Sequence, residues 1–141
     1  QGLTMIYLLD ATKARLQLLP SIAGWALFTA AEEGDRKAVP RAAIGFSSAR
    51  VVGVKTTAAQ VEPSVAITLV VKRGAGASAA LEAAMGAVIE QLHNWFPGEH
   101  GGRSWEPMRL AQITDPDFDS EEGLIGLTLA FTTQALYPGQ P

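Results

Sequence analysis

The stretch GLIGLTLAFTTQALY, residues 123–137, decides the fold class because its side chains alternate between two kinds of face. One face is large and apolar and the other is small or hydroxylated: Ile125, Leu127, Leu129 and Phe131 against Gly126, Thr128, Ala130 and Thr132. This period of two predicts a β-strand with one side on a core, where each buried large apolar side chain stabilises by roughly 1.5 to 3 kcal/mol. The opposite face lacks the charged residues expected of a surface that meets only water. It predicts a surface that another backbone approaches closely, and therefore an assembly surface.

Two earlier stretches repeat this pattern. Residues 40–47 and 63–73 each place branched or aromatic side chains on one face and small ones on the other. Between them, residues 48–62 are compatible with either a strand extension or a long hairpin loop, and we favour a hairpin that projects from the domain. Residues 22–30 and 105–113 are further strand candidates.

Two segments have helical periodicity. In the first, apolar residues recur from Met5 to Leu19, and Pro20 is expected to end the helix. The second runs from Ser78 to Phe96 and is expected to end at Pro97 and Gly98, with apolar residues at the i, i+3, i+4, i+7 spacing.

The expected order is helix, three strands, helix, two strands. We therefore predict an α+β fold, a two-layer sandwich in which two helices cover one face of a mostly antiparallel sheet of about five strands. The 141 residues fit a single domain spanning residues 1–141. Gln1 and Gly2 resemble the remnant of a cleavable expression tag and are left out of the fold prediction.

Composition argues against several functions. The net charge of −3 provides no basic field, so direct binding of nucleic acid is not expected. The absence of cysteine excludes disulfides and thiolate chemistry, and fits a reducing compartment such as the cytoplasm. No apolar run is long enough to span a membrane, and no signal peptide is evident, so no membrane association is expected.

The search for chemistry yields no catalytic, cofactor or metal site. His93 and His100 lack the i, i+4 spacing that would aim two imidazoles at one ion. The acidic stretch at residues 115–122 begins like a calcium loop, but Ser120 and Gly126 stand where such a loop needs Gly and Glu. A solvated turn or an electrostatic contact with a partner remains as its interpretation. Glu121 and Glu122 are adjacent and would point to opposite faces of a strand, so they do not form an acid/base pair.

Aromatic residues flank the glycine-rich turn at residues 98–104. Trp95, Phe96 and Trp105 are expected to close the core at the end of the second helix rather than to form a ligand cage. The turn itself, GEHGGRS, lacks the GK[ST] ending and the preceding strand of a phosphate-binding loop.

Four local patterns, in this order and at this length, resemble the tail terminator proteins of long-tailed bacteriophages, a family that includes the lambda-type minor tail protein U and the Mu-like terminators. They are the N-terminal helix, VPRAAIGF at residues 39–46, LHNWFP at residues 92–97, and DFDSEEGLIGLTLAFTT at residues 117–133. The resemblance covers most of the chain. It implies a virion tail protein without catalysis, assembled in the host cytoplasm, that forms a homo-oligomeric ring, expected to be a hexamer.

Such a ring caps the tail tube, stops tube polymerisation and provides the attachment surface for the head connector. The implied partners are further copies of the chain, the tail tube protein and the head-tail connector protein. Alternatives are another head-tail joining or neck protein, or a ferredoxin-like domain that binds a small molecule on its sheet. The candidate subunit or tube interface comprises Arg50, Lys55, Thr68, Asp117, Asp119, Glu121, Glu122, Thr128 and Thr132.

Overall fold

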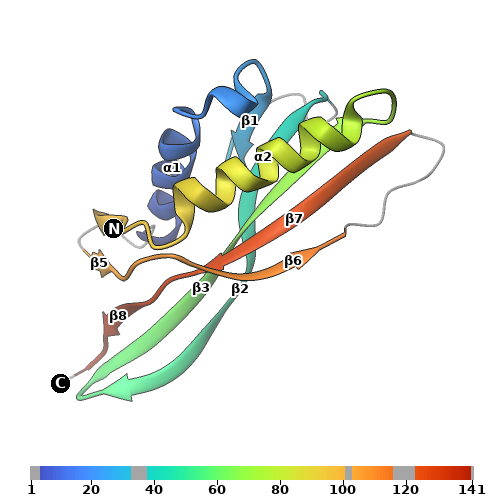
Figure 1. Cartoon of the computed structure of the whole chain (residues 1–141). Coiled ribbons are helices and arrows are strands. Elements are labelled where there is room, and N and C mark those ends of the chain that lie inside the picture. The colour runs from blue at the N-terminus through green and yellow to red at the C-terminus, as the bar shows by residue number, and fades with distance from the viewer. Residues whose placement is uncertain (1–3, 33–37, 101–102, 116–122, 141) are drawn as a thin grey trace.

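The computed structural model describes residues 4–32, 38–100, 103–115 and 123–140. Two helices lie on the same side of a twisted sheet, so the predicted α+β sandwich with both helices on one face is confirmed (Figure 1). The helices are α1 (Thr4–Leu16) and α2 (Ala77–Leu92), and a short 3-10 helix, η1 (Pro20–Ile22), follows α1.

The main sheet has six strands rather than about five. Its order is β1 (Ala26–Thr29), β2 (Arg41–Lys55), β3 (Ala58–Lys72), β7 (Leu124–Thr132) and β6 (Arg109–Thr114), with β8 (Ala135–Pro138) also paired to β3. The β1–β2 pair is parallel and the other pairs are antiparallel, as predicted for most of the sheet. A separate two-stranded sheet joins β4 (Gly98–His100) to β5 (Arg103–Trp105).

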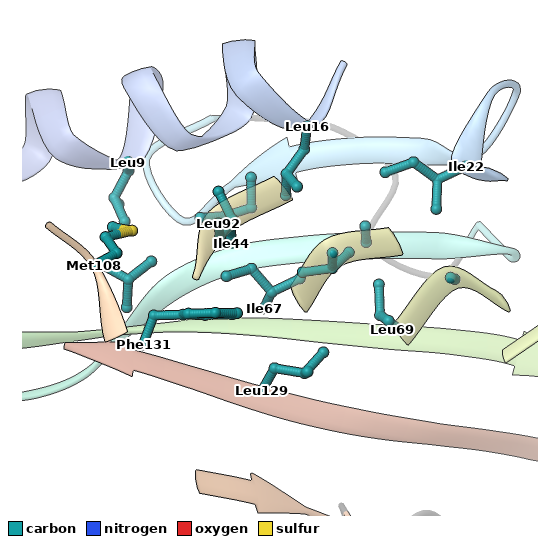
Figure 2. Close-up of a cluster of buried hydrophobic side chains, with 14 of the residues drawn as sticks. Leu9, Leu16, Ile22, Ile44, Ile67, Leu69, Leu92, Met108, Leu129 and Phe131 are labelled. Atoms are coloured by element: carbon teal, nitrogen blue, oxygen red, sulfur yellow. The ribbon is translucent and has the colours of Figure 1, made fainter. Parts of the chain in front are cut away.

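The core lies between the helices and one face of the sheet (Figure 2). In register, Ile44, Ile67 and Leu129 form one apolar row across three strands, and all three are buried. The predicted apolar stripe of α2 is confirmed by its buried residues: Leu81, Ala84, Val88 and Leu92. In α1 the buried stripe includes Leu8, Leu9, Leu16 and Thr12, whose hydroxyl donates to the carbonyl oxygen of Leu8 at 2.8 Å and so satisfies itself within the helix.

Both helices end earlier than predicted. α1 ends at Leu16, and η1 includes Ile22, where the first strand was predicted to begin, so that β1 starts only at Ala26. α2 ends at Leu92, because Asn94 adopts a positive φ of 67° and its N–H donates to the carbonyl of Met108 at 2.7 Å. Asn is among the few non-glycine residues that readily adopt this conformation.

The final stretch is not one strand. β7 pairs with β3 from Ser64 onward, whereas β8 pairs with β3 before Pro63. Proline has no N–H to donate to a ladder, which explains why pairing is interrupted there. At the break, the hydroxyl of Thr133 donates to the carbonyl oxygen of Glu106, and the N–H of Glu106 donates to the carbonyl oxygen of Gln134.

The single strand predicted at residues 105–113 is also divided, into β5 and β6. Pro107 lies in the gap, and the N–H of Met108 donates to the carbonyl of Trp95 at 2.8 Å instead of to the sheet. The glycine-rich turn contains β4 and part of β5, which sequence patterns did not indicate.

The projecting hairpin is confirmed, and it consists of continuous strands rather than a loop. β2 and β3 remain paired as far as Lys55 and Ala58, with Thr56 and Thr57 forming the turn (Figure 1). The pairing register shifts at Ser47 and Val52, which are local irregularities of the kind that bend an edge strand. β1 pairs only with Arg41 to Ile44, so among the described strands none pairs with the outer edge of β2 toward the hairpin tip.

Candidate assembly surfaces

The predicted threonines lie together on the sheet face opposite the core, because they alternate along β3 and β7 with the buried residues of the core face. Thr68 and Thr128 are directly cross-strand, with their hydroxyl oxygens 3.0 Å apart. Thr132, opposite Ser64, lies on the same face four residues further along β7. All three side chains are half-buried. The structure therefore brings these three candidate residues into one surface.

Small residues surround these threonines, as the alternation predicted. Ala43 is paired with Thr68 in the same row, and Gly45, Ala66 and Ala130 form the next row on this face. A Cβ added to Gly45 would meet the Cβ of Ala30 at 3.6 Å, which is an ordinary van der Waals contact. None of the described helices lies on this face of the sheet (Figure 1).

Arg50 and Lys55 lie on the hairpin, away from the threonine row. Nε of Arg50 donates to Oε1 of Glu62 at 3.0 Å, directly across the β2–β3 ladder. Lys55 is exposed beside the turn and makes no ion pair with any residue that the structure describes. Asp117, Asp119, Glu121 and Glu122 lie outside the described residues, so their part of the predicted interface remains a prediction.

Sequence patterns missed a polar network at the base of the hairpin. Gln134, between β7 and β8, donates from Nε2 to Oε2 of Glu62 at 2.9 Å and accepts from Nε2 of Gln60 at 2.6 Å. The Gln134 hydrogen bond, and then Arg50, lower the pKa of the Glu62 carboxyl, while burial acts in the opposite direction. Glu62 is thus held as an anion in a structural role. A carboxyl with a lowered pKa is a poor proton donor near neutral pH.

A groove of about 410 Å³ lies beside this network, between β5 and β8. Its lining includes Gln60, Trp105, Glu106 and two exposed apolar side chains, Phe96 and Leu136. The exposure of Phe96 (56%) contradicts its predicted role in closing the core, whereas Trp105 is completely buried. A second cavity of about 250 Å³ adjoins the groove and shares Glu106, Pro107 and Gln134 with it.

Two buried donors near this groove have no acceptor within the described parts of the chain. They are the indole Nε1 of Trp105 and Nε of Arg103. Both side chains contact Tyr137 of β8: the guanidinium lies 3.7 Å from the ring centroid, and the indole meets the ring edge-on at 6.3 Å. A buried donor without a partner costs roughly 1–3 kcal/mol.

The structure shows the surroundings of His93 and of the other residue types that could bind a metal ion. Nδ1 of His93 accepts a hydrogen bond from the N–H of Leu110 at 3.0 Å, which gives this side chain a structural partner. Within residues 4–32, 38–100, 103–115 and 123–140, no three His, Asp or Glu side chains gather in a way that could hold a metal ion. No described helix is long and apolar enough to cross a membrane.

The fold resembles that of a solved virion component. A chain from the structure titled "Virion of native gene transfer agent (GTA) particle" superposes with a TM-score of 0.70 and 15% sequence identity, covering 96% of this chain and 99% of that chain. Known protein families and curated protein sequences yield no match. At this identity the likeness establishes a shared fold over nearly the whole length of both chains.

Proposed function

We propose that this protein is a structural subunit of a phage or prophage tail, namely a tail terminator whose ring caps the tail tube and stops its polymerisation. One observation carries the proposal: the chain shares its fold, nearly end to end, with a component of a gene transfer agent virion. The resemblance of its sequence patterns to tail terminators points in the same direction. The ring also provides the surface to which the head connector attaches.

The surfaces of the molecule suit this role. Rings form through heterologous interfaces, in which one patch of each subunit contacts a different patch of the next. The chain offers several distinct candidates: the projecting hairpin, the groove between β5 and β8, and the sheet face around Thr68 and Thr128. A heterologous contact between neighbours would use two of these surfaces, and the third would remain for the tube or the connector.

The proposed role is assembly without catalysis. The carboxyl of Glu62, whose pKa is lowered, accepts hydrogen bonds from Arg50 and Gln134 at the base of the hairpin. These contacts give Glu62 a structural role. The candidate contacts are Arg50, Lys55, Thr68, Thr128 and Thr132, together with the acidic residues Asp117, Asp119, Glu121 and Glu122.

The test is a tube-assembly assay with purified tail tube protein. The chain is expected to form a ring, seen as a hexamer by electron microscopy or native mass measurement, either alone or on tube ends. Tubes grown with it should stop at a limited length. Tubes that grow equally long with and without the protein would refute the terminator role. Binding to the connector without any effect on tube growth would indicate a head-tail joining protein instead.

A further inference from the structure

We propose that neighbouring copies join when the hairpin tip of one subunit occupies the groove between β5 and β8 of the next. This inference rests on the proposed function, because it specifies how the ring subunits contact one another. It assigns a partner, a second copy of this chain, to two surfaces that the single chain leaves exposed.

The hairpin tip is the donor surface. Val51, Val52 and Val54 are 64%, 40% and 76% exposed, although all three are apolar and lie on strand β2. In this part of β2 the outer edge pairs with none of the described strands, so backbone N–H and C=O groups face outward. An apolar open edge is a template for contact with another chain.

The groove has the complementary chemistry. Phe96 and Leu136, which line it, are exposed apolar side chains that valines could cover. Trp105, which is completely buried, forms part of its lining beneath these two side chains.

The charges agree with this pairing. Lys55 is exposed at the tip, and Glu106 is exposed in the lining of the groove. Neither forms an ion pair with a residue that the structure describes. A basic tip meeting an acidic groove favours association between copies and fixes its direction.

The tip of a subunit cannot fill the groove of the same subunit. Near the tip, β3 lies between β2 and β8 in the sheet, because Ala59 is paired with Val54 on one side and with Tyr137 on the other. This pairing keeps the tip in the plane of the sheet. Because donor and acceptor surfaces differ, each copy can give its tip to one neighbour and its groove to another. Repetition of this contact is the arrangement that closes a ring.

Cysteine cross-linking tests the contact directly, because the natural chain contains no cysteine. Val54→Cys and Phe96→Cys are prepared as separate variants, mixed, and oxidised under conditions in which rings or capped tubes form. A disulfide requires the two Cα atoms to lie within about 7 Å, so the proposal expects a V54C–F96C heterodimer at least about fivefold above a mixture of V54C with A14C. Ala14 is exposed on α1 and serves as the matched control.

Charge reversal provides a second test. Lys55→Glu and Glu106→Lys should each weaken ring formation at least about tenfold in concentration, and combining them in one chain should restore much of it. Thermal unfolding of each variant checks that the fold is retained.

The outcomes separate this inference from the proposed function. Intact rings or capped tubes with cross-linking at the control level, or with V54C–V54C as the main product, would overturn the tip-in-groove contact and leave the terminator role standing. A natural chain that neither forms rings nor binds tubes would overturn both.

Discussion

Gln134 joins two segments that are far apart in sequence by hydrogen bonds to Glu62 and Gln60. Its Nε2 donates to the Glu62 carboxylate at 2.9 Å, and its side-chain oxygen accepts from Gln60 at 2.6 Å. The residue lies where the chain leaves β7 and continues as β8. The network therefore ties the base of the hairpin to the segment in which the last strand changes its position along β3.

Replacing Glu62 should reveal the strength of this connection. Glu62→Leu removes the acceptor of Gln134, and we expect the free energy of unfolding to fall by about 1–3 kcal/mol. Glu62→Gln keeps an acceptor oxygen and should cost less. Arg50→Met is the control, because the Arg50 side chain is 73% exposed and a surface ion pair contributes about 1 kcal/mol or less. Urea denaturation followed by tryptophan fluorescence measures all three, and equal stability of E62L and the natural chain would contradict the role of the network.

The same carboxyl predicts a dependence of stability on pH. The pKa of Glu62 is lowered in the folded state, first by Gln134 and then by Arg50, so folding favours the anion. Its stabilising contribution is complete above the pKa of an unfolded glutamate, about 4.3, and is lost as the pH falls through the lower folded value. Stability measured from about pH 6 to pH 3 should thus decline, and E62Q should decline less. Parallel curves for the two proteins would argue against this source of acid sensitivity.

Phe131 and Phe96 make a matched pair for testing the core. Phe131 is completely buried between the sheet and the helices (Figure 2). Phe96 is 56% exposed. Phe131→Ala should lower the free energy of unfolding by about 3–5 kcal/mol, because it leaves a cavity among packed neighbours. Phe96→Ala should change it by about 0.5 kcal/mol or less. The comparison uses the same substitution in both places, and a large loss for F96A would show that Phe96 closes the core after all.

The elements that sequence patterns predicted are those whose signal is local. The alternation in β7 and the spacing of Leu81, Ala84, Val88 and Leu92 each specify a face without reference to any other segment. The break between β7 and β8 depends on Pro63 in the partner strand, and no pattern within the last stretch itself records that dependence. The split at Pro107 had a local signal, since proline rarely continues a central strand.

The candidate surfaces likewise divide into those with a local sequence signal and those that depend on distant segments. Thr68, Thr128 and Thr132 were found because small, hydroxylated faces recur in two strands, and the structure places them on one surface. The network of Glu62, Gln60 and Gln134 was missed because Gln134 lies more than 70 residues from the other two and each is an ordinary polar residue in its own sequence context. The buried N–H groups of Arg103 and Trp105 became recognisable only when β5 was placed against β8.

The sheet face around Thr128 gives a final prediction that is independent of the hairpin and the groove. Thr128→Lys places a long charged side chain among small residues opposite Thr68. Loss of the threonine pair should cost the monomer only about 0.2–1 kcal/mol, and the half-buried position leaves the lysine a route to water. If this face contacts the tube or the connector, T128K should abolish that contact, because a buried unpaired charge opposes association. The double variant T68V/T128V keeps the shape, removes the hydroxyls and should bind nearly as well as the natural chain. Pelleting with tubes and with connector measures both variants, and full binding by a folded T128K would exclude this face from either interface.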